Sequence, residues 1–377
     1  MRRLGLLLIA VIAISAVVAP LAYFSSINQS ANAKEDELRF GVTCGEDTVE
    51  GTKLLIDRVQ NFTNLFVIDS SLISNNQTAL DAVCNYTASK NLHFIVYFFS
   101  LYASEWQQEW VVNAKQMWGD MFLGVYLRDE PGGRQMEVAE TVPNASSYSQ
   151  AAGKFVDAVS STWSMQFLKD RAIPVVTSDF VLYWFDYQAG FDVIFTELGW
   201  NNSRAQEIGL CRGAATAQGK DWGAIVTWTY QQAPYLGSGL EIYQDMVTAY
   251  EAGAKYILMF DYYPNDTQAN DFGTLADEHF AAMQQFWTYA NAHPRDLVKT
   301  KGEVALVLPK DYGWGMRSIE DKIWGLWAAD NSSTLIWQNV NALIKRYGLK
   351  LDIVYDGYGI NYVKEYSKVY MWNETIT

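Results

Sequence analysis

The chain has 377 residues, with 42 Asp and Glu against 28 Lys and Arg, and a formal net charge of −14 at pH 7. Nucleic acids and anionic lipid surfaces bind clusters of Lys and Arg, so this balance excludes both as principal partners. Half of the residues are hydrophobic and 15% are aromatic, which supports a large core and leaves rings that can pack on the apolar faces of sugars.

Residues 1–33 are predicted to be a signal peptide or an N-terminal membrane anchor. Arg2 and Arg3 precede an apolar run at residues 4–24, and a pattern suited to signal-peptidase cleavage follows at residues 31–33. The apolar run is also long enough to span a bilayer, so membrane attachment through residues 4–24 is the alternative to cleavage. The remaining chain is expected to be extracellular, either secreted or anchored to the outer face of the cell membrane.

Nine Asn-x-Ser/Thr triplets favour the same location, because such triplets are N-glycosylation acceptors in exported proteins. The alternative is that a chain rich in Ser and Thr contains them by chance. They begin at Asn28, Asn61, Asn76, Asn85, Asn144, Asn201, Asn265, Asn331 and Asn373.

Eight short apolar runs alternate with longer amphipathic segments between Arg39 and about Pro294, which predicts an α/β fold, a (β/α)8 TIM barrel. A doubly wound sheet is the alternative, but the turn after the first run lacks a dinucleotide-binding glycine pattern. The clearest helical patterns cover residues 49–59, 77–90, 146–170 and 241–254. The predicted strands cover residues 39–44, 65–71, 92–100, 122–130, 174–180, 192–200, 222–230 and 255–263.

The predicted domains are the targeting segment, a catalytic barrel at residues 34–298, and a small α/β accessory module at residues 299–377. Apolar runs at 304–309, 351–357 and 367–372 predict the strands of this flavodoxin-like module. The sequence stops where an open sheet would still need covering, so the module is expected to be incomplete.

Acidic and aromatic residues mark the carboxyl ends of the predicted barrel strands, where TIM barrels carry their function. Carboxylates hydrogen-bond to hydroxyl groups and rings pack on sugar faces, so this rim predicts a neutral glycan as substrate. The residues assigned to substrate binding are Asp69, Tyr97, Trp200, Trp228, Tyr230, Asp261 and Tyr262.

Glu130 and Glu197 are the predicted catalytic pair, with Asp129 replacing or supporting Glu130. Glycoside hydrolysis needs one carboxyl group to protonate the leaving oxygen and a second to attack the anomeric carbon or activate water. Asp129 and Glu130 are neighbours on one predicted strand, so their side chains should point to opposite faces. Pro131 favours an extended Glu130 that continues the strand. The reaction would require no cofactor and no metal.

Structural roles are the alternatives for these acids. Asp129 and Glu130 could form ion pairs with Arg128 or Arg134, and Glu197 could cap the helix that follows it. Asp69 precedes Ser70 and Ser71 and could be a turn or cap residue. Asp261 could equally be structural, and Trp228 and Tyr230 could serve core or rim packing.

The eight-unit pattern, with RDEPGG on strand four, FTELGW on six, VTWTY on seven and FDYYP on eight, resembles the TIM-barrel glycoside hydrolases. The large clan that uses strands four and seven has Asn-Glu on four and Glu on seven, whereas this chain has Asp129-Glu130 and no acid near Trp228. Acids on strands four and six are similar to those of α-galactosidase-type barrels, although those barrels use Asp at both places. The C-terminal module is similar to accessory domains that follow the barrel in some β-galactosidases.

Other enzyme classes have little support in the sequence. The three histidines, His93, His279 and His293, and the three cysteines lack metal-ligand spacing, and no nucleophile elbow is present. Cys44, Cys84 and Cys211 allow one disulfide and one free thiol. The competing hypothesis is a non-catalytic glycan-binding or surface-layer glycoprotein built on a glycosidase-like barrel.

Overall fold

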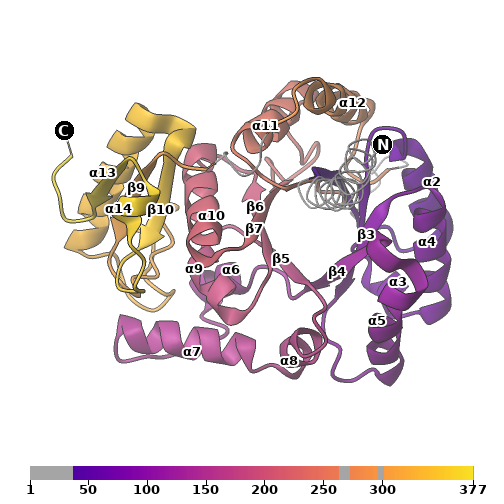
Figure 1. Cartoon of the computed structure of the whole chain (residues 1–377), viewed down its shortest axis with the longest axis horizontal. Helices are drawn as coiled ribbons and strands as arrows, with labels where there is room; N and C mark the ends of the chain where they lie inside the picture. The colour runs from indigo at the N-terminus through magenta and orange to yellow at the C-terminus, as the bar shows by residue number, and fades with distance from the viewer. Residues whose placement is uncertain (1–36, 263–271, 296–300, 377) are drawn as a thin grey trace, which may run out of the picture. The chain divides into compact units, whose positions relative to one another are not determined.

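The computed structural model describes residues 37–262, 272–295 and 301–376 (Figure 1). Within them, β1 to β8 form a closed barrel in which every strand is parallel to the next and β8 pairs with β1. The predicted (β/α)8 barrel is therefore confirmed. The predicted signal peptide or anchor lies outside the described residues.

Each of the eight predicted apolar runs contains one barrel strand. β1 occupies its whole run and β7 begins one residue before its own. The other strands, and the end of β7, stop short of their runs, because the polar and aromatic residues at the ends of those runs leave the sheet and form the mouth of the barrel. Their bounds are β1 Arg39–Cys44, β2 Leu65–Ile68, β3 His93–Phe98, β4 Phe122–Leu127, β5 Val175–Asp179, β6 Val193–Leu198, β7 Asp221–Val226 and β8 Tyr256–Met259.

The helices lie outside the ring of strands, with α11 and α12 at the top of the view and α7 and α8 at the bottom (Figure 1). The helix predicted at 146–170 is two helices, because the Thr162 side chain accepts a hydrogen bond from the Met165 amide and starts α8 anew. The bounds are α2 Val49–Val59, α3 Ser71–Ser74, α4 Gln77–Ser89, α5 Glu105–Trp118, α6 Pro131–Val138, α7 Tyr148–Ser160, α8 Trp163–Lys169, α9 Tyr183–Ala189, α10 Arg204–Gln218, α11 Gly239–Glu251 and α12 Asp277–Ala292, with a short 3-10 turn at Gly119–Met121.

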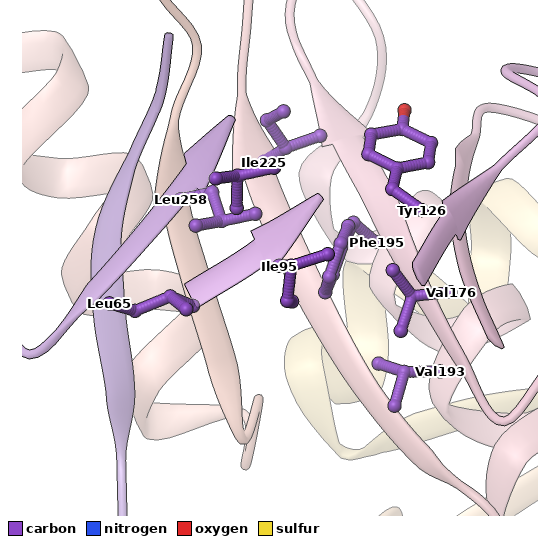
Figure 2. Close-up of a cluster of buried hydrophobic side chains, with 9 residues drawn as sticks. Leu65, Ile95, Tyr126, Val176, Val193, Phe195, Ile225 and Leu258 are labelled. Carbon is purple, nitrogen blue, oxygen red and sulfur yellow. The ribbon is translucent and has the colours of Figure 1, made fainter. Parts of the chain in front are cut away.

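The barrel interior is filled by alternate residues of the strands, among them Leu65, Ile95, Val176 and Phe195 (Figure 2). Tyr126 belongs to this cluster, and its ring lies 6.3 Å from that of Phe195. Its hydroxyl oxygen points away from the aliphatic side chains (Figure 2). The Tyr126 hydroxyl therefore places a polar atom at the edge of this apolar cluster.

The C-terminal module is a small, three-stranded parallel sheet with the order β10-β9-β11. All three predicted strands are present. Its elements are β9 Val304–Leu308, α13 Asn331–Tyr347, a 3-10 turn at Gly348–Lys350, β10 Leu351–Tyr355, α14 Tyr362–Glu365 and β11 Lys368–Met371.

Two glycines let α10 of the barrel pack directly on β10 of this module. A Cβ atom at Gly209 would lie 2.8 Å from the carbonyl oxygen of Leu351, and one at Gly213 would lie 2.6 Å from that of Ile353. Any larger residue would push the helix off the strand. Through this contact, residues 39–377 form one compact unit.

Cys44, Cys84 and Cys211 are all free thiols, so the disulfide that three cysteines allow is not formed. Burial raises the pKa of each thiol, which keeps them protonated and unreactive. Among the helices that the structure describes, none has the length and apolar character needed to cross a bilayer.

Glu207 on α10 makes folding stability depend on pH. It is buried, it accepts a 2.7 Å hydrogen bond from the Tyr183 hydroxyl, and burial raises the pKa of its carboxyl to about 7. An unfolded Glu titrates at about 4.3. Between these two pKa values the folded state binds a proton that the unfolded state has lost. The contribution of this proton to the free energy of unfolding is complete below the unfolded pKa and is lost as the pH rises to the folded pKa.

We expect Glu207→Gln, which is neutral at every pH, to reduce the loss of unfolding free energy between about pH 5 and about pH 8. Guanidinium unfolding of both proteins at the two pH values measures this. An equal loss in wild type and variant would contradict the assignment.

Candidate active site

The turn after β4 sends two adjacent carboxylates into one cavity. β4 ends at Leu127, and both Arg128 and Glu130 take left-handed backbone conformations with φ of 55° and 47°. For residues other than glycine this costs on the order of 1 kcal/mol each. Two expectations are therefore wrong: Glu130 does not continue the strand, and the side chains of Asp129 and Glu130 do not diverge, because the alternation of a strand ends before them.

Asp179, at the end of β5, holds this turn in place. Its carboxylate accepts hydrogen bonds from the amides of Gly132 at 2.6 Å and Gly133 at 3.0 Å, in the first turn of α6. A Cβ atom at Gly132 would lie 2.9 Å from Asp179 Oδ2, so glycine is needed for this approach. The Glu130 amide also donates to the carbonyl of Ser178 at 3.2 Å. The backbone of the reactive turn is thus fixed by the neighbouring strand.

The cavity has a volume of about 270 Å³ and opens at the carboxyl ends of the strands. Asp129, Glu130 and Glu197 line it together with Asp69 and Ser178. The structure therefore brings the three catalytic candidates of the sequence together in one cavity.

Ser178 and Tyr126 connect the acids. Asp129 Oδ1 accepts a 2.5 Å hydrogen bond from the Tyr126 hydroxyl and a 3.1 Å hydrogen bond from Ser178 Oγ. Ser178 Oγ also lies 2.8 Å from Glu197 Oε1. These last two distances, 3.1 and 2.8 Å, limit the separation of the Asp129 and Glu197 oxygens to at most about 5.9 Å. Asp129 is thus oriented by two hydroxyl groups and lies close to Glu197.

The carboxyls of Glu130 and Glu197 both have raised pKa values. Burial, and then the charge of Asp129, raise the pKa of the Glu130 carboxyl to about 7, while a hydrogen bond from Glu197 opposes the shift. Burial also raises the pKa of Glu197 well above its usual value, with further contributions from the charges of Glu130 and Asp129. Because the charge of each carboxylate disfavours ionisation of the other, we expect the two groups to titrate together, with one of them protonated near neutral pH.

The other predicted site residues fall into three groups. Trp200 and Trp228 line the cavity, as does Asp69, whose pKa is raised by burial and by Asp129. The Tyr97 ring lies 5.4 Å from the Tyr126 ring.

Two tyrosines lie further out on the rim. The Tyr262 ring lies 5.4 Å from that of Trp228 and is tilted against it by 48°. Tyr230 is 47% exposed and lines a neighbouring open cavity.

The structure does not bring Asp261 to the cavity. Its carboxylate is fully buried and accepts hydrogen bonds from the amide and hydroxyl of Thr274. The strand explains this placement, because Leu258 of β8 points into the barrel and the inward face therefore continues through Phe260. Asp261, one residue after Phe260, therefore points away from the barrel interior.

The alternative roles for the catalytic candidates are occupied by other residues. The guanidinium groups of Arg128 and Arg134 contact Glu140 at 3.2 and 3.1 Å. Ser203 lies at the N-cap position of α10. Glu197, which could have capped that helix, is instead hydrogen-bonded to Ser178.

Sequence reasoning missed Ser178 and Tyr126. A signal for Ser178 was present: Val176 points into the barrel, so the residue two positions further also faces the interior. By the same alternation, Phe195 points into the barrel interior and Glu197, two residues further along β6, faces the cavity. Applied strand by strand, this alternation separates cavity residues from those of the outer face.

No family model and no curated protein matches the sequence. Among solved structures, the chain is similar to a β-1,4-D-mannanase from Cryptopygus antarcticus, with 12% identity and a TM-score of 0.44 over 71% of this chain and 93% of that one. A D-allulose 3-epimerase from Methylomonas sp. matches with 10% identity and a TM-score of 0.40 over 68% and 98%. ScGas2 matches with 13% and 0.40 over 70% and 68%.

These neighbours include glycosidases and other TIM-barrel enzymes, and similarity at this level does not distinguish between their activities. In the described ranges no group of three His, Cys, Asp or Glu has a geometry suited to a metal ion.

Proposed function

We propose that this protein is an extracellular glycoside hydrolase that cleaves O-glycosidic bonds of a neutral glycan and retains the configuration of the anomeric carbon. The observation that carries the proposal is the set of three carboxyl groups in one cavity, held in unequal environments. Asp129 is oriented by the Tyr126 and Ser178 hydroxyls, while burial raises the pKa of both Glu130 and Glu197. Carboxyl groups in one site whose environments differ in this way take separate acid and nucleophile roles.

In this mechanism Asp129 attacks the anomeric carbon while the Glu130–Glu197 pair protonates the leaving oxygen. The glycosidic C–O bond breaks and a glycosyl ester of Asp129 forms. Water, which loses a proton to the same pair, then hydrolyses the ester and restores both groups. Retaining enzymes separate the two carboxyls by about 5–5.5 Å, and the upper limit of about 5.9 Å between Asp129 and Glu197 is compatible with that spacing.

We expect Asp129→Asn to abolish hydrolysis in a panel of neutral aryl glycosides and oligosaccharides, because the amide is a poor nucleophile. Added azide should restore turnover of aryl glycosides and give a glycosyl azide of opposite anomeric configuration. Glu109→Gln on the exposed face of α5 is the matched control. Full activity of Asp129→Asn would refute the assignment of Asp129 as the nucleophile. A wild-type protein that binds glycans and cleaves none would favour the glycan-binding alternative.

An extracellular location is part of the proposal. All seven acceptor asparagines within the described residues are exposed, as modification by an oligosaccharide requires; they are Asn61, Asn76, Asn85, Asn144, Asn201, Asn331 and Asn373. Mass spectrometry of the protein from its native cells should find glycan on several of them. Unmodified asparagines throughout would count against this location.

A further inference from the structure

Two more cavities share walls with the catalytic cavity. One, of about 210 Å³, is lined by Tyr97 and Phe99 from the end of β3 and by residues that follow β4 or belong to α7 and α8, and Asp129 belongs to both it and the catalytic cavity. The other, wide open and of about 700 Å³, is lined by Tyr230 and neighbouring residues after β7, and Trp200 belongs to both it and the catalytic cavity. Each of the two hollows therefore adjoins the catalytic cavity.

The barrel topology gives this series a direction. β3 and β7 are four steps apart in a closed ring of eight strands, so they lie on opposite sides of the barrel. Phe99, which follows β3, and Tyr230, which follows β7, consequently lie on opposite sides of the mouth. A pocket for a single terminal sugar would be closed on one side, whereas these three hollows, together called the groove, include a cavity that adjoins the acids on each side.

The groove and its rim carry all of the exposed large aromatic side chains among the described residues. They form two groups, one on each side of the catalytic cavity. Phe99, Tyr102 and Trp163 lie on the β3 side, with exposed fractions of 74%, 70% and 38%; Trp200, Tyr230 and Tyr262 lie on the β7 side, with 40%, 47% and 41%.

Contacts confirm the first group, since the rings of Tyr102 and Trp163 lie 6.0 Å apart although α5 separates them in sequence. Single exposed apolar residues need no explanation, but the other exposed large hydrophobics of the described chain are all aliphatic. Amide side chains of Gln231 and Gln232 accompany the aromatic rings on the β7 side and can bind neutral hydroxyl groups.

We infer that the groove holds a linear neutral polysaccharide across at least three sugar units, with the scissile bond at the central cavity, so that the enzyme cleaves inside chains. This inference rests on the proposed glycosidase site and adds the polymeric nature of the substrate. Each outer aromatic group supplies a platform for a sugar on one side of the acids.

Binding to polysaccharides tests the groove separately from catalysis. The variant with both Glu130→Gln and Glu197→Gln is run through native gels containing hydroxyethyl cellulose, galactomannan, laminarin or dextran. We expect at least one polymer to retard it. Further substitution of Phe99→Ala or Tyr230→Ala, at opposite ends of the groove, should each weaken the apparent affinity roughly 2- to 10-fold. Val363→Ala, an equally exposed position on α14 of the C-terminal module, is the control and should leave it unchanged.

The wild-type enzyme should lower the viscosity of the retained polymer before many reducing ends appear. Three results would overturn the inference: no retardation by any polymer, no effect of either aromatic substitution, or release of terminal sugars alone. Cleavage of short aryl glycosides in those cases would leave the proposed hydrolysis standing. Retardation without cleavage by the wild type would support the groove and refute the hydrolysis.

Discussion

Replacing Glu130 and Glu197 together with Gln is expected to lower kcat/KM by roughly 10²–10⁴-fold, the usual contribution of general acid catalysis. Neither amide can deliver a proton to the leaving oxygen. The loss should be much smaller for aryl glycosides whose leaving group needs no protonation, and Asp129 should still form its glycosyl ester with them. An equal loss on both kinds of substrate would show that the pair does not act as the acid.

The single variant Glu130→Gln adds a pH test to this prediction. In the wild type the acid must be protonated, so kcat/KM should fall as the pH rises past about 7, the pKa of Glu130. Without the charge of Glu130, which raises the pKa of Glu197, the remaining acid should lose its proton at lower pH. The falling limb of the pH profile should therefore move to lower pH. An unmoved limb would mean that the two groups do not titrate together.

Arg212→Met is expected to destabilise the fold by about 3–5 kcal/mol, because it leaves a buried charge without its partner. Arg212 on α10 is 2% exposed, and its Nε donates to Asp352 Oδ1 of the C-terminal module at 2.7 Å, with Asp352 fully buried. Its other nitrogens donate to backbone carbonyls at Ala252, Leu349 and Leu351. Barrel and module are therefore expected to unfold together, and chemical unfolding measures the loss.

The exposed pair Lys301–Glu365, at 3.4 Å, is the control for this prediction. Lys301→Met should cost less than about 1 kcal/mol, because water screens both groups. Equal effects of the two substitutions, or a separate unfolding transition for the module in the wild-type protein, would contradict the role given to Arg212.

The fold was largely readable from the sequence, because the signals for it are local. Continuous apolar runs such as those of β1 and β9 can be buried on both faces only in a parallel sheet, and the amphipathic segments between them can cover it. The sequence predicts a single helix at residues 146–170, because its apolar spacing continues through Ser161 and Thr162. A single hydrogen bond from the Met165 amide to the Thr162 side chain divides it.

The candidate site was readable in part. Strand-end position was enough to bring Glu197, Asp69 and Trp228 to one cavity with the acids of strand four. Strand-end position was insufficient for Asp261, because its side chain points to the face of the strand opposite the cavity. There it accepts hydrogen bonds from Thr274.

By itself, the sequence determined the eightfold alternation, and with it the end of the barrel at which acids and aromatic rings collect. Only the tertiary structure decided that Asp129 and Glu130 share a cavity, because their side-chain directions depend on left-handed backbone at Arg128 and Glu130. That backbone is held by Asp179 of another strand. The raised pKa values of Glu130 and Glu197 likewise depend on distance and burial across strands, and local sequence patterns encode neither.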